Sequence, residues 1–539
     1  MSQEVTKVLT IRGLKVAAPN GAILVDGVDL DLAPGEVLGL IGESGAGKST
    51  IGLAAMGYGR GGCRIVGGTI DIGGVSLMEG SRADREAMRG AKIAYVAQSA
   101  AAAFNPAIRI GEQIIEGALY HGKMTRPEAE AWKLELLKTL QLPSPETFGD
   151  RYPHQVSGGQ LQRAMVAMAM SCRPDIIVLD EPTTALDVTT QIEVLALLRS
   201  LIHRYNTAAL YITHDLAVVA QVANRIMVLR HGKLVEQGST EQVLESPRED
   251  YTRKLVAERQ GNLSNAVSAQ AVGEVLLEVN AVDAYYGKTA VLEQISCQLR
   301  RGETLAVVGE SGSGKSTLAR AIVGLMPTAS GMISFDGSRL ERSYKKRSRE
   351  ELRRIQLVYQ LPDVALNPRQ TVGEIIGRPM KFYFGMHDVP QQKEVARLLD
   401  LIGLPQDFAT RLPGALSGGQ KQRVCIARAL AAKPDLIICD EVTSALDPLV
   451  AEDILKLLKS LQQQLGLSYL FITHDLGVVR RLANRTIVMQ RGRIVEQGPT
   501  AEIFQPPFHP YTEELVTSVP ELRRDWLDTV LAKRPQATI

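Results

Sequence analysis

Two copies of a glycine-rich loop constrain this chain more than any other feature of its sequence. Residues 42–50 read Gly-Glu-Ser-Gly-Ala-Gly-Lys-Ser-Thr, and residues 309–317 read Gly-Glu-Ser-Gly-Ser-Gly-Lys-Ser-Thr. Both fit the phosphate-loop pattern G-x-x-x-x-G-K-[ST], and both follow apolar runs, at 37–41 and 304–308, that are typical of buried strands. Backbone N–H groups of such a loop point at a phosphate, and the helix that follows adds its positive N-terminal end. The chain is therefore predicted to bind a nucleoside triphosphate twice.

Within each loop the residue types have different tasks. Lys48 and Lys315 would neutralise the β- and γ-phosphate oxygens, and the hydroxyls of Ser49 and Ser316 would face Mg²⁺. The residues expected to hold the nucleotide are Gly42, Glu43, Ser44, Gly45, Gly47, Lys48, Ser49 and Thr50 in the first copy, and Gly309, Glu310, Ser311, Gly312, Gly314, Lys315, Ser316 and Thr317 in the second.

Other landmarks recur at nearly the same distance along the chain. Ser157, Asp180, His214 and Tyr251 are each followed 260 residues later by the same residue type, at Ser417, Asp440, His474 and Tyr511. A period of this length is too long for a solenoid and indicates a duplicated domain. We expect one domain over residues 1–258, a linker over 259–274, a second domain over 275–519 and a polar tail over 520–539.

Composition agrees with two soluble domains and excludes several classes of protein. The chain has 539 residues and a formal net charge of +2, so no global field draws it to nucleic acid. Its five cysteines have no C-x-x-C spacing, which argues against a zinc site or a disulfide framework. No signal peptide and no apolar stretch long enough to span a membrane is apparent. We therefore expect a cytosolic protein that reaches a membrane only through partners.

The pattern of strands and helices predicts an α/β fold in each half. Apolar runs at 92–98, 176–179 and 208–212, and their counterparts at 355–360, 436–439 and 467–472, alternate with helical segments, as in a mostly parallel sheet. Residues 1–35 and 275–302 read as short alternating strands of an antiparallel layer. Residues 111–150 and 373–410 are predicted to be helical.

Two carboxylates follow one strand in each half. Asp180 and Asp440 are placed to hold Mg²⁺, and Glu181 and Glu441, one residue on, could polarise an attacking water. In isolation such a pair is more often a solvated turn or a helix start. Beside a phosphate loop, in both halves, the catalytic interpretation is favoured.

Glutamines and histidines at strand ends complete the predicted sites. Gln98 and Gln360 could reach Mg²⁺ or the water, although either alone would be read as a surface residue. His214 and His474 each end an apolar strand, where a histidine is usually a cap or a core residue but could also contact the γ-phosphate.

The sequence Ser-Gly-Gly-Gln opens a helix in each half and offers a second anion-binding site through its free N–H groups. Together with the loops, glutamines, acids, Ala-Leu-Asp (185–187 and 445–447) and histidines, in this order and twice, it resembles the signature of ATP-binding-cassette (ABC) ATPases. The signature residues are Ser157, Gly158, Gly159 and Gln160 in the first half, and Ser417, Gly418, Gly419 and Gln420 in the second.

The resemblance implies two tandem cassettes, each with a parallel core sheet, an antiparallel β layer and a helical subdomain, that bind ATP and Mg²⁺. It also implies a head-to-tail sandwich with two composite sites. One would set Lys48, Glu181 and His214 against Ser417 and Gly419; the other would set Lys315, Glu441 and His474 against Ser157 and Gly159, and Asp187 and Asp447 would cross the interface. Tyr286 lies where the family stacks an aromatic ring on adenine, whereas the first half offers Ala17, Ala18 and Pro19. Val442 replaces the usual proline, which the first half keeps at Pro182.

Two further features resemble the oligopeptide and dipeptide importer ATPases. Asn-Pro at 105–106 and 367–368, each followed by a Gly-Glu pair, resembles their extended glutamine loop, and Phe-His-Pro-Tyr-Thr at 508–512 resembles their C-terminal motif. This resemblance implies an ATPase on the cytoplasmic face of the bacterial inner membrane. Its partners would be two transmembrane permeases, whose helices would dock near Gln98 and Gln360, and an extracytoplasmic solute-binding protein. Peptides are the expected solute.

Other functions stay open. Relatives in the same subfamily carry nickel, opines, glycosides or glutathione, and the ATPase need not touch the solute. A soluble tandem ATPase acting on ribosomes is the rival from another class, and the basic run at 342–354 could be cited for RNA. Such proteins usually have a long charged linker, whereas residues 259–273 are short and mostly uncharged. A DNA-repair cassette protein would need zinc cysteines or coiled-coil arms.

Overall fold

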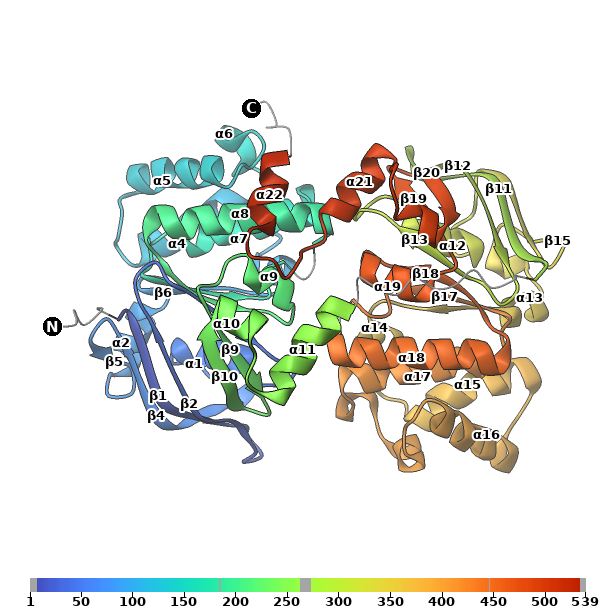
Figure 1. The fold of residues 1–539 in the computed structure, drawn as a ribbon, viewed down its shortest axis with the longest axis horizontal. Helices are drawn as coiled ribbons and strands as arrows, with labels where there is room; N and C mark the ends of the chain where they lie inside the picture. The colour runs from blue at the N-terminus through green and yellow to red at the C-terminus, as the bar shows by residue number, and fades with distance from the viewer. Residues whose placement is uncertain (1–6, 184–185, 262–272, 445, 534–539) are drawn as a thin grey trace. The chain divides into compact units, whose positions relative to one another are not determined.

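The computed structural model describes residues 7–183, 186–261, 273–444 and 446–533 (Figure 1). The chain divides into two compact units: residues 1–260 together with 520–539, and residues 261–519. Most of the expected linker lies outside the described residues, and Arg259 belongs to the end of helix α11.

The first unit contains two sheets. An antiparallel sheet has the order β2-β1-β4-β5, and a second, largely parallel sheet has the order β10-β9-β3-β8-β7-β6, in which only β9 and β10 pair antiparallel. The strands are β1 (Leu9–Ala17), β2 (Ile23–Leu32), β3 (Val37–Ile41), β4 (Arg64–Ile72), β5 (Val75–Ser76), β6 (Ile93–Val96), β7 (Ile176–Asp180), β8 (Ala208–Ile212), β9 (Arg225–Arg230) and β10 (Lys233–Ser239).

Helices follow the strands of the parallel sheet and build a helical subdomain between β6 and β7. The helices of the first unit are α1 (Lys48–Ala55), α2 (Arg82–Met88), α3 (Ala100–Ala103), α4 (Ile110–Tyr120), α5 (Arg126–Thr139), α6 (Pro145–Phe148), α7 (Gly158–Ala169), α8 (Val188–Tyr205), α9 (Leu216–Ala220), α10 (Thr240–Glu245), α11 (Asp250–Gly261) and α22 (Trp526–Lys533), with 3₁₀ turns at Arg60–Gly62 and Pro153–Gln155.

The second unit repeats this arrangement. Its antiparallel sheet has the order β12-β11-β14-β15, and its parallel sheet has the order β16-β17-β18-β13-β19-β20. The strands are β11 (Val275–Tyr286), β12 (Thr289–Arg300), β13 (Thr304–Val308), β14 (Ser330–Phe335), β15 (Ser338–Arg339), β16 (Ile355–Val358), β17 (Leu436–Asp440), β18 (Ser468–Ile472), β19 (Arg485–Gln490) and β20 (Arg493–Pro499). The helices are α12 (Lys315–Ile322), α13 (Arg349–Arg354), α14 (Pro362–Ala365), α15 (Val372–Phe384), α16 (Asp388–Leu401), α17 (Gly418–Leu430), α18 (Pro448–Leu465), α19 (Leu476–Leu482), α20 (Thr500–Ile503) and α21 (Pro510–Thr517), with 3₁₀ turns at Tyr344–Lys346, Gln406–Thr410 and Pro413–Ala415.

Burial explains why the central strands read as continuous apolar runs. Every residue of β3, β7 and β8 is buried, and the same holds for β13, β17 and β18. A parallel sheet covered on both faces requires this composition, whereas β1 alternates buried and accessible positions as expected for an antiparallel layer. The predicted α/β fold with two tandem domains is confirmed.

The C-terminal segment differs from the expected polar tail. Residues 520–533 contain the helix α22, which belongs to the first unit and lies beside α8 and α9 (Figure 1). Trp526 and Leu527 are buried, and Asp528 forms an ion pair with Arg199 of α8. An eight-residue helix within a polar stretch gives only a weak periodic signal, which is why the sequence did not reveal it.

Candidate active sites

Each phosphate loop connects a buried strand to a helix through a glycine that no other residue could replace without strain. Gly42 has a φ of 157°, and a Cβ atom there would lie 2.2 Å from the carbonyl oxygen of Leu229. Gly309 has a φ of 145°, and its Cβ would lie 2.1 Å from the carbonyl oxygen of Met489. Both loops therefore pass against a neighbouring strand of the parallel sheet, β9 or β19, and lead directly into the helices α1 and α12.

The loop lysines are buried and fully engaged with their own loops. Lys48 Nζ donates to the carbonyl oxygens of Gly42 at 2.6 Å and Glu43 at 2.8 Å. Lys315 Nζ donates to those of Gly309 at 2.8 Å and Glu310 at 2.7 Å. Each ammonium group therefore lies inside its loop, and its positive charge favours the ionised form of the strand-end aspartate, Asp180 or Asp440. The predicted role of the two lysines fits this geometry.

The strand-end aspartates lie beside the loop serines. Ser49 Oγ donates to Asp180 Oδ1 at 2.9 Å, and Ser316 Oγ donates to Asp440 Oδ1 at 2.9 Å. Both aspartates are less than a tenth exposed. Burial raises the pKa of each, although the serine hydrogen bond opposes this shift. A hydroxyl and a carboxylate oxygen thus share one small oxygen-lined site in each half.

The glutamates after these aspartates adopt a backbone conformation that is uncommon for residues other than glycine. Glu181 has a φ of 49° and Glu441 a φ of 51°. Strain of this kind clusters at functional sites. The φ values of the two glutamates nearly coincide, although Glu181 is followed by Pro182 and Glu441 by Val442. The backbone at the glutamate is therefore the same with valine as with proline after it.

A glutamine and a histidine meet each glutamate on separate carboxylate oxygens. Gln98 Nε2 donates to Glu181 Oε2 at 2.8 Å, while His214 Nδ1 lies 3.0 Å from Glu181 Oε1. In the second half Gln360 Nε2 donates to Glu441 Oε2 at 2.7 Å. His474 Nδ1 lies 3.5 Å from Glu441 Oε1. The structure thus brings together the predicted catalytic residues of each half around one carboxylate.

In each half the glutamate raises the pKa of the histidine beside it, and in the second half the histidine also lowers the pKa of the glutamate. Burial disfavours the charged form of His214, but the hydrogen bond and charge of Glu181 outweigh it, so the pKa of His214 is raised from its ordinary 6.5. The hydrogen bond and charge of Glu441 raise the pKa of His474 in the same way. Burial likewise raises the pKa of Glu441, yet the bond and charge of His474 prevail and lower it from 4.5.

These shifts predict how the stability of the nucleotide-free protein depends on pH. A raised histidine pKa adds stability that is complete below pH 6.5 and is lost as the pH rises through the folded value. The lowered pKa of Glu441 adds stability that is present above pH 4.5 and is lost on acidification. The melting-temperature advantage of the native chain over a His214→Gln/His474→Gln variant should therefore shrink as the pH rises above 6.5. His203→Gln, which alters an exposed histidine of α8, should show no such trend; an advantage that grew with pH would contradict the assignment.

The signature residues open α7 and α17 with a capping box. Ser157 Oγ accepts from the Gln160 N–H at 3.3 Å, and Gln160 Oε1 accepts from the Ser157 N–H at 3.1 Å. Ser417 and Gln420 repeat both bonds at 3.3 and 2.9 Å. Both serines and the glycines after them, Gly158 and Gly418, are exposed. The helix N-termini therefore present their first residues to solvent.

The second signature glycine has a packing role that the sequence did not reveal. A Cβ on Gly159 would lie 2.6 Å from Thr190 Cγ2, and one on Gly419 would lie 2.3 Å from Val450 Cγ1. Asp187 caps α8 by accepting from the Thr190 N–H, and Asp447 caps α18 by accepting from the Val450 N–H, both at 3.0 Å. Ala185 and the residue at 445 lie outside the described residues. In each half the start of the signature helix thus packs closely against the first turn of the helix that the Ala-Leu-Asp aspartate caps.

A tyrosine in each half, Tyr511 of the C-terminal motif and its counterpart Tyr251, lies beside the phosphate loop. Tyr511, in the segment 508–512, is buried and its hydroxyl accepts from the Glu310 N–H at 3.0 Å. Its counterpart Tyr251 is buried near Glu43, and burial together with the charge of Glu43 raises its pKa. The sequence drew attention to both tyrosines through their matching spacing, and to Tyr511 through its motif, but neither feature indicated a position beside the phosphate loop. Tyr286 ends β11 half exposed, and its hydroxyl accepts from Arg320 Nη1 at 3.2 Å.

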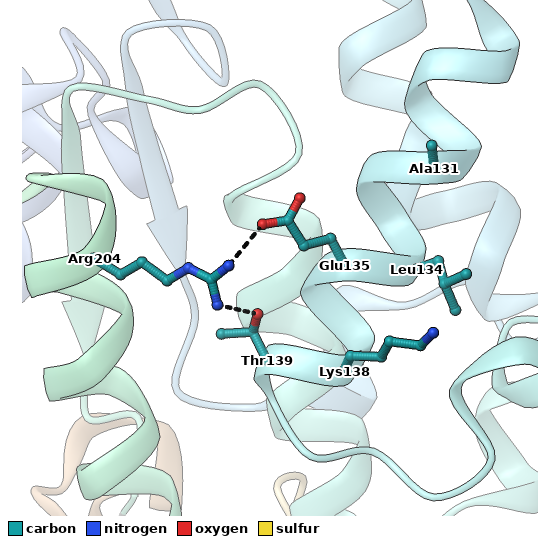
Figure 2. A pocket seen from close by; sticks show the side chains of 6 residues that line it. All are labelled: Ala131, Leu134, Glu135, Lys138, Thr139 and Arg204. Carbon is teal, nitrogen blue, oxygen red and sulfur yellow. Dashed lines mark hydrogen bonds and ion pairs between the residues drawn. The ribbon is translucent and has the colours of Figure 1, made fainter.

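A surface depression in the first unit lies apart from these residues. It is lined by α5 and the end of α8, as Figure 2 shows, and its charged groups are already paired. Arg204 donates to Glu135 Oε1 at 3.1 Å and to Thr139 Oγ1 at 3.4 Å. None of its lining residues belongs to the predicted sites, and it supports no ligand proposal.

Comparison with known families agrees with the geometry. Residues 25–184 and 292–444 match the family model described as ABC transporter, which covers both phosphate loops and both strand-end carboxylate pairs. The chain belongs to the ABC transporter ATP-binding proteins. Residues 495–538 of this ABC ATPase match the model described as Oligopeptide/dipeptide transporter, C-terminal region. It is thus an ATP-binding, ATP-hydrolysing subunit of an ABC importer of the oligopeptide/dipeptide family.

Curated relatives match the ABC ATPase over nearly its whole length. It is 38% identical to the "Glutathione import ATP-binding protein GsiA" of Salmonella choleraesuis (strain SC-B67), across 95% of this chain and 89% of the relative. The protein of the same name from Escherichia coli (strain K12) is also 38% identical, across 92% of this chain and 86% of the relative. Among solved structures, cbiO1 from Clostridium perfringens is 31% identical with a TM-score of 0.39, covering 43% of this chain and 91% of that one.

Among the helices in the described part of the ABC ATPase, none is both long and apolar enough to cross a membrane.

Proposed function

We propose that this ABC ATPase powers the uptake of short peptides, glutathione included. The observation that carries the proposal is the match of residues 495–538 to the C-terminal region of oligopeptide/dipeptide transporters. Relatives named for glutathione import support it, because glutathione is itself a small peptide. Nickel, opines and glycosides remain the alternative solutes, and a solute-dependent assay separates them.

Mg²⁺ is proposed to accompany ATP at both sites. Ser49 with Asp180, and Ser316 with Asp440, supply the hard oxygen atoms that Mg²⁺ prefers, and each aspartate is buried with no ion-pair partner among the described residues. Within those residues no group of three or more His, Cys, Asp or Glu could hold a metal on its own. This is expected, because Mg²⁺ is usually bound through one or two side chains plus phosphates and water. When bound, the ion would neutralise charge that develops on the phosphate oxygens.

In each half the chain's own residues would divide the work of hydrolysis. Lys48 and Lys315 would hold the β- and γ-phosphates, and Glu181 and Glu441 would accept a proton from the attacking water. Gln98 and His214 would keep the Glu181 carboxylate oriented, since each occupies one of its oxygens. Gln360 and His474 would do the same for Glu441.

We further propose that the two halves close head to tail around two ATP molecules. Ser417 and Gly419 would then complete the site of Lys48, and Ser157 and Gly159 would complete the site of Lys315. The motif order of the family and the exposed helix N-termini support this pairing. A Ser417→Arg chain should therefore lose turnover at the Lys48 site, and combining it with Glu181→Gln should add nothing further.

The remaining partners would be two permeases and an extracytoplasmic binding protein, which would place the ABC ATPase at the cytoplasmic face of the inner membrane. The helices of the permeases would dock near Gln98 and Gln360. Apolar side chains beside the second glutamine support this, because Tyr359, Leu361 and Val364 are 40%, 52% and 82% exposed.

The test is ATPase activity of the chain alone, then with its permeases in lipid and with binding protein loaded with dipeptides, tripeptides or glutathione. Stimulation by the peptide-loaded binding protein is the expected result. The Glu181→Gln/Glu441→Gln chain in the same vesicles is the control for contaminating ATPases. Activity that ignores the permeases but rises with ribosomes would overturn the proposal.

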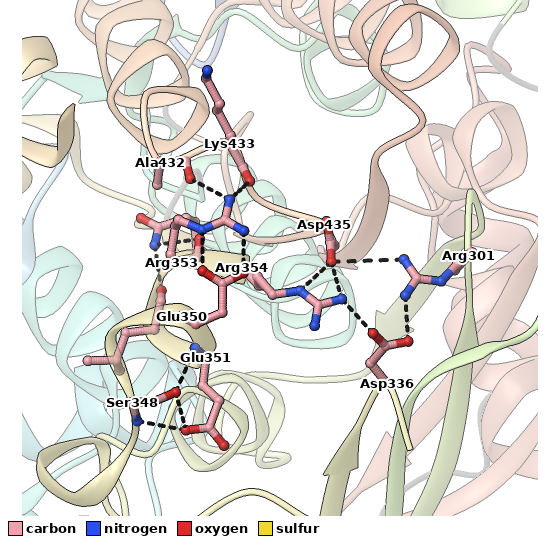
Figure 3. A network of polar contacts seen from close by, with 12 residues as sticks. Arg301, Asp336, Ser348, Glu350, Glu351, Arg353, Arg354, Ala432, Lys433 and Asp435 are labelled. Carbon is pink, nitrogen blue, oxygen red and sulfur yellow. Dashed lines mark hydrogen bonds and ion pairs between the residues drawn. The ribbon is translucent and has the colours of Figure 1, made fainter. Parts of the chain in front are cut away.

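The basic run at 342–354 gives little support to the ribosome alternative. Figure 3 shows that two of its arginines, Arg353 and Arg354, are engaged within the second unit. Arg354 Nε donates to Asp435 at 2.6 Å and its Nη2 to Asp336 at 2.7 Å, while Arg353 donates to Glu350 and to the Lys433 carbonyl. These bonds connect α13 to the loop after β14 and to the loop before β17. Arginines used in this way are poorly placed to bind RNA phosphates.

A further inference from the structure

The two metal-facing aspartates differ in how they are held. In the first half the Tyr95 hydroxyl donates to Asp180 Oδ2 at 2.5 Å, while Ser49 holds Oδ1. Tyr95 lies on β6, which pairs in parallel with β7, and its ring packs against the core of the first unit. The carboxylate of Asp180 is therefore fixed at both oxygens from two different elements.

In the second half the residue at the equivalent position carries no hydroxyl group. Leu357 occupies the equivalent place on β16, where it packs against the corresponding core and pairs with Ile438 of β17. Among the described residues, Ser316 is the only side chain that donates a hydrogen bond to Asp440. The positive charge of Arg320 acts on Asp440, and the residue at the equivalent place on α1 is the uncharged Leu53.

A carboxylate that accepts hydrogen bonds at both oxygens is limited to one orientation. Hydrogen bonds to charged groups are among the stronger ones in proteins, and a group held in advance loses less freedom when it binds a ligand. We infer that Tyr95 is a positioning residue that sets the orientation of Asp180 toward the divalent metal. The first ATP site consequently binds the metal more tightly than it would with the leucine of the second site, so the two sites differ in metal affinity. This inference rests on the proposed Mg²⁺ sites.

The test measures metal binding and does not depend on turnover. Mn²⁺ would be titrated by electron paramagnetic resonance into the full chain with a β,γ-imido analogue of ATP, in an Asp440→Asn background that leaves only the first site. Tyr95→Phe removes one oxygen atom and keeps the ring. It should weaken Mn²⁺ binding at least about tenfold, the size expected from losing a hydrogen bond to a charged group, and leave analogue binding in EDTA unchanged.

Tyr359→Phe in an Asp180→Asn background is the matched control, because it removes the same hydroxyl from a half-exposed tyrosine beside Gln360 in the second half. It should leave Mn²⁺ affinity unchanged. If Tyr95→Phe does not fold, Tyr95→Leu gives the first half the residue of the second and is measured in its place. Unchanged Mn²⁺ affinity in the Tyr95 variant would overturn this inference about Tyr95 but leave the proposed metal sites standing. Mn²⁺ binding that persists in an Asp180→Asn/Asp440→Asn chain would overturn the proposed metal sites as well.

Discussion

Replacing Glu181 and Glu441 together by glutamine should abolish ATP hydrolysis while the chain still binds ATP. Each carboxylate is held by a glutamine on one oxygen and a histidine on the other, at a backbone position with positive φ. A glutamine side chain keeps the shape but cannot accept a proton from water. General-base catalysis contributes about 10²–10⁴-fold, so phosphate release should fall at least about 100-fold. Binding of a fluorescent ATP analogue should persist, because the phosphates are held by Lys48 and Lys315.

The matched control changes one glutamate of each half that lies outside the sites. Glu241 of α10 and Glu502 of α20 are exposed, so Glu241→Gln/Glu502→Gln makes the same change in net charge. That chain should hydrolyse ATP at the native rate. The single variants Glu181→Gln and Glu441→Gln then show how turnover divides between the halves. A double variant that kept more than a tenth of the native rate would remove both glutamates from the role of general base.

The sequence predicted the parts of the fold that burial dictates. The runs at 37–41, 176–179 and 436–439 are apolar along their whole length because parallel strands in this sheet are covered on both faces. The phosphate loops were predictable because φ values such as that of Gly42 admit only glycine at little cost. These signals are local, and a local signal can be read without knowing which element packs against which.

The side-chain contacts that the sequence did not reveal join positions far apart in the chain. Tyr95 is 85 residues from Asp180, and Tyr511 is 201 residues from Glu310. From the sequence, a tyrosine such as Tyr95 within a strand is expected only to be buried. The pairing of β6 with β7 in the structure brings its hydroxyl to the carboxylate of Asp180. The same holds for the clustering of Gln98 and His214 on Glu181, which the sequence placed in one site but not on one carboxylate.

Trp526→Ala should destabilise the first unit strongly, although Trp526 stands near the end of the chain. Its side chain is 2% exposed, and Leu527 beside it is fully buried. Replacing a buried tryptophan by alanine costs about 3–5 kcal/mol. For a unit of this size that corresponds to a fall of roughly 10 °C in melting temperature. Differential scanning calorimetry should show the loss in one transition, and the transition of the second unit should stay in place.

The position of this segment links the loss of stability to the first ATP site. Gln221, just after α9, donates to the carbonyl oxygens of Glu521 at 2.8 Å and Arg523 at 3.0 Å and accepts from the Leu527 N–H at 3.1 Å. Arg259 donates to the Pro520 carbonyl and lies 3.6 Å from Asp215, the neighbour of His214.

Loosening α22 should therefore lower turnover in a Glu441→Gln background, where the first site alone works, more than in a Glu181→Gln background. Arg524→Ala, in the same segment but exposed, should change neither the melting temperature nor turnover. Equal effects of Trp526→Ala in the two backgrounds would mean that α22 stabilises the unit without acting on the histidine of its site.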